Sequence, residues 1–228
     1  MPARQSSLGS KTAAVLLKDI KSEFRTRYAI GAIVMFAVIT VIAVGFATSG
    51  VGLDRDLQGI VLWLVIYFAS VAGLGQSFIK EEENRTALAL RMFALPSSVF
   101  GGKYLFNLIL LMALVIVIVP LFIFLVGLEI ECIPLFLAVV ALGTLGLAGS
   151  TTIIAAIISK ASIKGVLFAV MSFPLILPLL IMAIKGTQKA LYENSEFING
   201  LPELKVLISY AIVMSIAGFL LFEYVWND

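Results

Sequence analysis

The sequence predicts an all-α, polytopic membrane protein with six transmembrane helices. Of its 228 residues, 61% are hydrophobic and only 13% are charged. A soluble domain carries about 25% charged residues, because water has to solvate its surface. About half of that charge leaves too little polar surface for a soluble globule. Six long uncharged stretches divide the chain, which indicates that most of the surface faces lipid.

The six uncharged stretches are near or above the length of a membrane-spanning helix. A bilayer core of about 30 Å is crossed by about 20 helical residues. The 16 Lys and Arg and the 14 Asp and Glu all fall outside these stretches. None of the stretches has the period-two alternation of a barrel strand. We therefore predict one transmembrane domain comprising residues 1–228, with spans at residues 29–48, 60–79, 104–128, 132–159, 165–184 and 206–222.

A different pattern precedes the first span. Apolar residues recur every four positions while basic residues lie on another face, namely Leu16, Ile20, Phe24 and Tyr28 against Lys18, Lys21 and Arg25. This pattern is typical of an amphipathic helix that lies in the lipid headgroup layer. An ordinary cytoplasmic helix leading into the first span is the alternative.

The distribution of basic residues predicts the orientation. Six Lys and Arg precede the first span, four lie in the second loop and two in the fourth loop. On the other side, the first loop has one, the third none and the fifth three. Loops rich in Lys and Arg stay in the cytoplasm. Both termini should therefore be cytoplasmic, and Cys132 should face the opposite compartment.

Several kinds of chemistry are excluded by composition. The chain has no histidine, the commonest general base and metal ligand, and its single cysteine, Cys132, excludes an internal disulfide. No ionisable residue lies in the six stretches, which argues against a proton-coupled carrier, while Na⁺ sites built from carbonyls and hydroxyls stay open. A phosphate-binding G-x-x-x-x-G-K-[ST] loop is also absent. We expect no catalytic residue, metal site, directly bound cofactor or nucleic-acid partner, and an energy source for any transport in another protein.

The second loop has the features of a cytoplasmic docking helix. Acidic residues at its front suit a helix N-terminus, and a proline ends it. Three apolar residues at i, i+4 and i+7 form a ridge that could fill a groove in a soluble partner. The alternative is that the ridge rests on lipid headgroups or on the underside of the protein itself. The predicted coupling residues are Glu81, Glu82, Glu83, Leu88, Met92, Leu95 and Pro96.

Small residues line one face of the second span and one of the fourth. Small side chains let membrane helices approach closely. The faces serve either packing within the chain or a seam with a second copy or a partner subunit. The residues are Ala69, Gly73 and Ser77, and Gly143, Gly146 and Ser150.

Two prolines, Pro174 and Pro178, lie inside the fifth span. Each removes a backbone amide and disrupts the helical bond to the carbonyl four residues earlier. The resulting kinks give either a fixed shape or a moving hinge. After this span, the loop at residues 185–205 is expected to carry one or two short helices on the outer side, where a partner would meet the chain.

Aromatic residues near the ends of two spans fit interfacial anchors, which prefer the headgroup level. They are Trp63, Tyr67, Tyr224 and Trp226.

The second loop also resembles a known segment. The sequence FIKEEENRT at residues 78–86, running on to Pro96 and followed by Gly102 and Lys103, resembles the coupling segment of ABC-2-type permeases. One departure is Arg85, where many of these permeases have glycine. The start of the coupling helix is therefore expected to differ here.

Two further motifs narrow the resemblance. The sequences LGTLGL at residues 142–147 and FPLILPLL at residues 173–180 are similar to those of the CcmB family, the permease subunit of the cytochrome c maturation system. This resemblance implies a bacterial inner-membrane complex of two permease copies, a separate ABC ATPase, a haem-handling membrane subunit and a haem chaperone. In that family ATP hydrolysis is tied to release of the haem-loaded chaperone, and whether haem passes through the permease stays open.

Haem would then be handled by the complex rather than bound by this chain. The chain offers haem iron only methionine, tyrosine or Cys132 as axial ligands, so we expect another subunit to hold the iron. The alternatives are an ABC-2-type permease for another substrate, an ATP-independent carrier of a neutral solute, and a scaffold that assembles partner proteins without transport.

Overall fold

The computed structural model describes residues 8–26, 28–49, 52–74, 78, 81, 90, 92, 94–159, 164–192 and 196–227. Their long helices are α1 (Leu8–Thr26), α2 (Tyr28–Thr48), α3 (Arg55–Leu74), α6 (Pro96–Phe122), α7 (Ile133–Ile158), α8 (Lys164–Leu191) and α9 (Leu201–Asn227). A π-helical turn, Ile123–Gly127, extends α6, and a 3-10 turn, Phe197–Gly200, precedes α9. Within this part of the chain there is no strand, and six helices are long and apolar enough to cross a membrane. The predicted all-α fold with six spans is confirmed.

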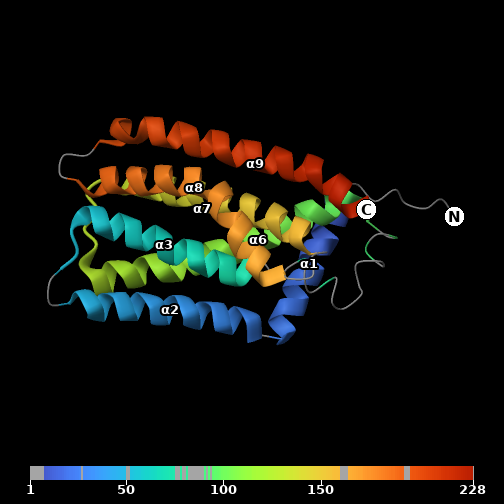
Figure 1. Cartoon of the computed structure of the whole chain (residues 1–228), viewed down its shortest axis with the longest axis horizontal. Coiled ribbons are helices and arrows are strands. Elements are labelled where there is room, and N and C mark those ends of the chain that lie inside the picture. The colour runs from blue at the N-terminus through green and yellow to red at the C-terminus, as the bar shows by residue number, and fades with distance from the viewer. Residues whose placement is uncertain are drawn as a thin grey trace.

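The six spans form one bundle of roughly antiparallel helices (Figure 1). Helix α7 is the most enclosed, because it packs against α3, α6, α8 and α9. Helix α2 lies at one side of the bundle and contacts α3 and α6. Helix α1 runs steeply across one end of the bundle, where α9 also finishes. We call this end the α1 end and the other the opposite end.

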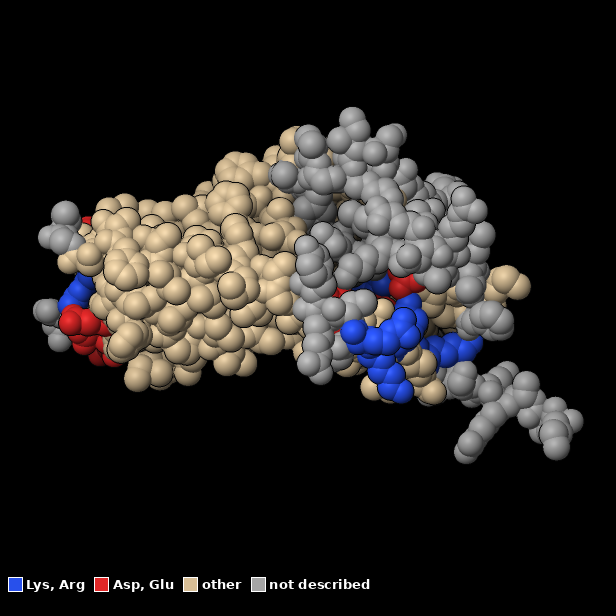
Figure 2. Space-filling view, turned by 90° about the horizontal axis from the view of Figure 1, so that it is seen from below, with Lys and Arg blue, Asp and Glu red and all other residues tan. Residues whose placement is uncertain are grey.

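On the face that Figure 2 shows, the charged side chains of the described residues lie at the two ends. Figure 2 shows a broad band without Lys, Arg, Asp or Glu between them. Apolar side chains project outward from the band, for example Phe46, Ile116 and Phe124 with 77%, 71% and 83% exposure. Lipid tails solvate such side chains, so no hydrophobic driving force buries them inside the protein. The band therefore corresponds to the membrane.

Helices extend beyond the charge-free stretches. Helix α3 begins at Arg55 rather than residue 60, and α6 begins at Pro96 rather than residue 104. Helix α8 continues to Leu191 instead of ending at residue 184. A helix can keep its hydrogen bonds while its charged ends leave the hydrocarbon, so a charge-free window reports only the apolar part of each helix.

The loop at residues 185–205 is shorter than expected for the same reason. Most of residues 185–205 belong to the ends of α8 and α9, with a 3-10 turn, Phe197–Gly200, before α9. Among the residues described, the expectation of one or two short helices in this loop is met by this single 3-10 turn.

Two of the expected interfacial aromatics are in the core instead. Trp63 is 0% exposed and donates a hydrogen bond from Nε1 to Thr187 Oγ1 at 2.8 Å. Tyr67 is 3% exposed, and its hydroxyl lies 3.1 Å from Ser172 Oγ. Polar tips that find partners on α8 can be buried within the bundle, so proximity to a span end did not place them at the interface.

Of the two interfacial aromatics expected at the end of α9, one is exposed and the other is buried. Tyr224 is 75% exposed, as an interfacial position requires. Trp226 is 7% exposed and stacks on Phe222, with ring centroids 5.2 Å apart.

Candidate functional site

A buried lysine, Lys103, lies two turns from the start of α6 and is 1% exposed. The two glycines before it let α1 approach closely. A Cβ added at Gly102 would lie 2.7 Å from the Val15 side chain, and one at Gly101 would lie 3.3 Å from Thr12. The missing side chains therefore bring α1 against the first turns of α6.

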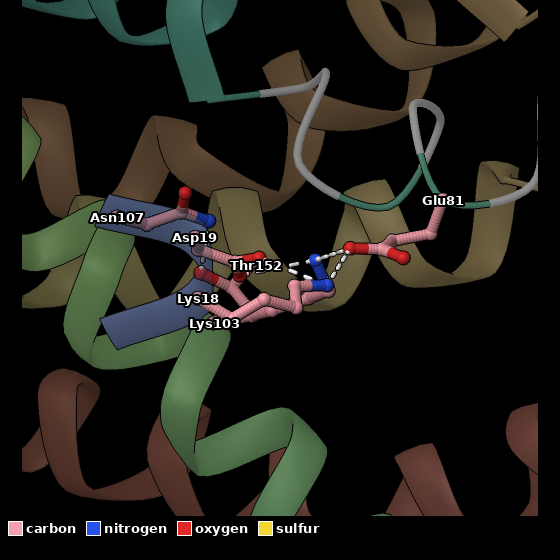
Figure 3. A network of polar contacts seen from close by, with 6 residues as sticks. All are labelled: Lys18, Asp19, Glu81, Lys103, Asn107 and Thr152. Carbon is pink, nitrogen blue, oxygen red and sulfur yellow. Dashed lines mark hydrogen bonds and ion pairs between the residues drawn. The ribbon is translucent and has the colours of Figure 1, made fainter. Parts of the chain in front are cut away.

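This packing assembles an ionic network from three separate segments (Figure 3). Lys103 Nζ lies 3.2 Å from Asp19 Oδ2 on α1 and 3.3 Å from Glu81 Oε1 in the second loop. Lys18 Nζ lies 3.2 Å from Asp19 Oδ1 and also pairs with Glu81 Oε1. The ring of Phe78 is 5.1 Å from Lys103 Nζ, a cation–π distance. Two ammonium groups and two carboxylates neutralise one another, and we call these four residues the ionic network.

The network holds its segments in one arrangement rather than supplying large net stability. Removing a charge from water costs several kcal/mol, and a good ion pair roughly returns that cost. Burial alone would lower the pKa of Lys18, but the hydrogen bond to Glu81 and the charges of Asp19 and Glu81 outweigh it and raise this pKa. Lys18 therefore stays charged at physiological pH.

A polar contact continues from the network into the bundle. Asn107 is one turn further along α6 than Lys103 and lies on the same face. Its Nδ2 donates to Thr152 Oγ1 of α7 at 2.9 Å, and both side chains are fully buried. The face of α6 that holds the network is thus also tied to the most enclosed span.

The predicted coupling segment is described in part. Leu90 and Met92 are helical, and the Ala94 amide donates to the Leu90 carbonyl at 2.9 Å. Leu95 is extended, with φ −69° and ψ 146°, and Pro96 is the first residue of α6. A residue before proline avoids the helical region, which explains why the segment breaks at this point. Pro96 thus follows the break, as predicted, and also opens the next span.

The two described members of the predicted ridge are exposed, but Leu95 is extended and so does not continue the helix of Met92, as the i+7 position of the ridge requires. Met92 is 80% exposed and Leu95 is 49% exposed. Glu81 behaves differently, because it is 8% exposed and faces Lys18 and Lys103. The remaining predicted coupling residues, Glu82, Glu83 and Leu88, lie outside the described residues.

Sequence reasoning missed the other three members of the network. The signals were present: Gly-Gly-Lys opens the third span, and Asp19 is one of the two acidic residues in a helix that carries four Lys and Arg. Only the approach of α1 to α6 makes these signals meaningful.

The predicted small residues contact neighbouring helices of the same chain. Ala69 is fully buried, while Ser77 lies outside the described residues. A Cβ added at Gly143 would lie 2.2 Å from the ring of Trp63, so α7 needs glycine there. The contacts pair Gly73 with Ile33, Gly143 with Trp63, Gly146 with Leu179 and Ser150 with Tyr210.

The predicted hinge prolines, Pro174 and Pro178, both lie inside a continuous α8. A neighbouring helix supports the backbone between them, since the Tyr210 hydroxyl donates to the Leu175 carbonyl at 2.8 Å. The same hydroxyl lies 2.8 Å from Ser150 Oγ, so α7, α8 and α9 meet here.

The opposite end carries its own polar contacts. Arg55 lies 3.3 Å from Glu129 and donates to the Leu191 carbonyl at 3.0 Å. Lys189 lies 2.7 Å from Glu203. Cys132 lies at this end but is only 8% exposed. Among the residues described, no cluster of three or more His, Cys, Asp or Glu is placed to hold a metal ion.

Comparison with known proteins now adds the family. The sequence model of the CcmB protein family matches residues 10–219, which include the ionic network, the predicted coupling segment and both prolines of α8. No match was found among the curated proteins or the solved structures. Because the match covers most of the chain and its bundle has the six expected spans, the protein belongs to the CcmB family.

Proposed function

We propose that this chain couples ATP hydrolysis by a separate ABC ATPase to haem export, or to release of a haem-loaded chaperone. Membership of the CcmB family gives the coarser role, a permease subunit in cytochrome c maturation. The proposal adds where the ATPase docks and how its movement reaches the spans.

The observation that supports this proposal is that the predicted coupling segment, residues 81–95, is attached to α6 at both ends. At its front, Glu81 pairs with Lys103, two turns into α6. At its back, Leu95 is joined directly to Pro96, where α6 begins. Between these attachments, the exposed Met92 offers a partner an apolar contact. A partner that moves this segment would therefore move the start of α6 and, through Asp19, also α1.

The other expected features of the complex belong to the same proposal. The chain lies in a bacterial inner membrane, with its α1 end on the cytoplasmic side. This orientation agrees with the basic residues of α1. Two permease copies act with an ATPase, a haem-handling membrane subunit and a haem chaperone. The haem iron is held by another subunit, since this chain has no histidine to offer it.

The test is a matched pair of double variants. Met92→Asp with Leu95→Asp would place charges in a desolvated groove, at a cost of several kcal/mol and at least a hundredfold in binding. Phe197→Asp with Ile198→Asp is the control, because these residues are 43% and 63% exposed at the opposite end. Both variants should reach the membrane, and only the first should lose the ATPase on purification in mild detergent.

The proposed docking site would be wrong if the Met92 and Leu95 variant retained the ATPase and its stimulated hydrolysis. Purification of the native chain without any ATPase, together with ATP-independent uptake, would support a carrier of a neutral solute instead.

A further inference from the structure

Helix α1 has three distinct faces, and the ionic network takes Asp19 from one of them and Lys18 from another. A helix turns 100° per residue, so neighbours at i, i+3 and i+4 share a face. The face packed on α6 comprises Thr12, Val15, Asp19 and Glu23, and the adjoining side carries the apolar Leu16, Leu17 and Ile20. The third face is solvent-exposed and carries Lys18, Lys21 and Arg25.

The sorting of charge on α1 leaves this third face purely cationic. Both acidic residues of the helix, Asp19 and Glu23, are turned to the packed face and are 8% exposed. Among the residues that the structure describes, Lys21 and Arg25 have no carboxylate within ion-pairing distance. Lys18 pairs with the network, yet 42% of its side chain is still exposed. We call Lys18, Lys21 and Arg25 the basic face.

We propose that the basic face binds the headgroups of anionic phospholipids. Its positive charge complements the phosphate groups of such lipids, and α1 runs across the end of the bundle, as a helix in the headgroup layer would (Figure 1). Figure 2 shows the Lys and Arg of this end beyond the uncharged band. The described basic residues exposed at this end come from α1.

Apolar side chains beside the basic face favour lipid over a soluble protein as its occupant. Leu17 is 55% exposed next to Lys21, in the amphipathic arrangement by which an interfacial helix inserts. The chain then passes into α2, where Met35 and Ile39 are 59% and 56% exposed towards lipid. A lipid layer around α2 would therefore reach α1 as well.

Lipid at the basic face would also bear on the network. The packed face of the same helix places Asp19 against Lys103. Headgroups that hold α1 from outside would keep its position on α6 fixed. Anionic lipid would thus hold α1 in the position in which Asp19 pairs with Lys103.

The test compares lipid retention by the purified full chain. The protein is equilibrated with a mixture of phosphatidylglycerol and phosphatidylcholine that carry the same acyl chains, and retained lipids are counted by native mass spectrometry. A basic residue near an anionic surface raises lipid binding about fivefold, so Lys21→Gln with Arg25→Gln should lower the preference for phosphatidylglycerol at least tenfold. Lys21→Arg with Arg25→Lys should preserve it.

The matched control is Lys185→Gln with Lys205→Gln, which removes two exposed cations at the opposite end. This control should keep the preference, and excess inorganic phosphate should not abolish it. Equal retention by the α1 variant and the native chain would overturn the proposal, as would an equal loss in the control. Loss of a protein partner with unchanged lipid preference would assign the basic face to that partner and also overturn it.

Discussion

Lys103 and Asp19, 84 positions apart, form a 3.2 Å ion pair that joins α6 to α1. Lys103 is almost fully enclosed, so its charge is tolerated only while its carboxylate partners are in place. The pair is therefore a sensitive indicator of whether α1, the second loop and α6 are assembled.

Replacing Lys103 by methionine should destabilise the protein strongly. The change leaves the carboxylates of Asp19 and Glu81 with one ammonium group fewer, and breaking a buried pair costs about 3–5 kcal/mol. Adding Asp19→Asn should recover part of that loss, since the uncompensated charge is removed. Thermal unfolding of the purified protein measures both effects, with Lys205→Met, an exposed lysine of α9, as the control. A Lys103→Met protein as stable as the native one would show that the network contributes nothing to stability.

A methyl group at Gly143 should also be costly, for a steric reason. The added Cβ would lie 2.2 Å from the ring of Trp63, which is fully buried and bonded to Thr187. Overpacking of this kind costs about 1–3 kcal/mol. Gly31→Ala is the control, because nothing lies within 4 Å of its added Cβ, and alanine favours a helix by about 1 kcal/mol. Equal unfolding temperatures for the two variants would mean that α3 and α7 can separate at this contact.

The spans could be predicted from sequence because lipid imposes one simple condition on them. An apolar helix long enough to cross the bilayer needs no knowledge of its neighbours. The ionic network has the reverse property. Lys103 and Glu81 are ordinary loop charges in the sequence, and only the packing of α1 at Gly102 encloses them. The prediction that Trp63 lies at the interface was wrong for a related reason, since its hydrogen-bond partner lies 124 positions away on α8.

Orientation can be tested with an introduced cysteine. The native Cys132 is only 8% exposed, so it is poorly placed to report its compartment by labelling. Glu129 lies nearby, and 77% of its side chain is exposed. In a Cys132→Ser background, Glu129→Cys should react with a membrane-impermeant maleimide in intact cells. Lys21→Cys on α1 should react only after permeabilisation, and the reverse pattern would invert the proposed topology.

The prolines of α8 present the remaining choice between a fixed shape and a moving hinge. Replacing Pro174 and Pro178 by alanine restores two backbone amides and should straighten the helix. If the segment moves during the cycle, assembly should remain intact while cytochrome c maturation falls in a complementation assay. Pro120→Ala is the control, because this proline lies inside α6, away from the contact with Tyr210. Unchanged maturation in the α8 variant would show that both prolines only fix the shape of the helix.

Tyr210 gives this test a structural readout that activity alone lacks. Its hydroxyl bonds to the Leu175 carbonyl, next to the Pro174 carbonyl, from which Pro178 removes the helical amide donor. Tyr210→Phe should therefore cost about 1–3 kcal/mol in the native background, because it removes the contacts of the hydroxyl with Leu175 and Ser150. With both prolines replaced, the amide of residue 178 restores the helical bond to the carbonyl of residue 174, so this turn depends less on Tyr210 and the cost should fall. A double-mutant cycle of unfolding free energies measures the difference. Strict additivity would show that Tyr210 supports α8 independently of the kink, and the hinge would then need another restraint.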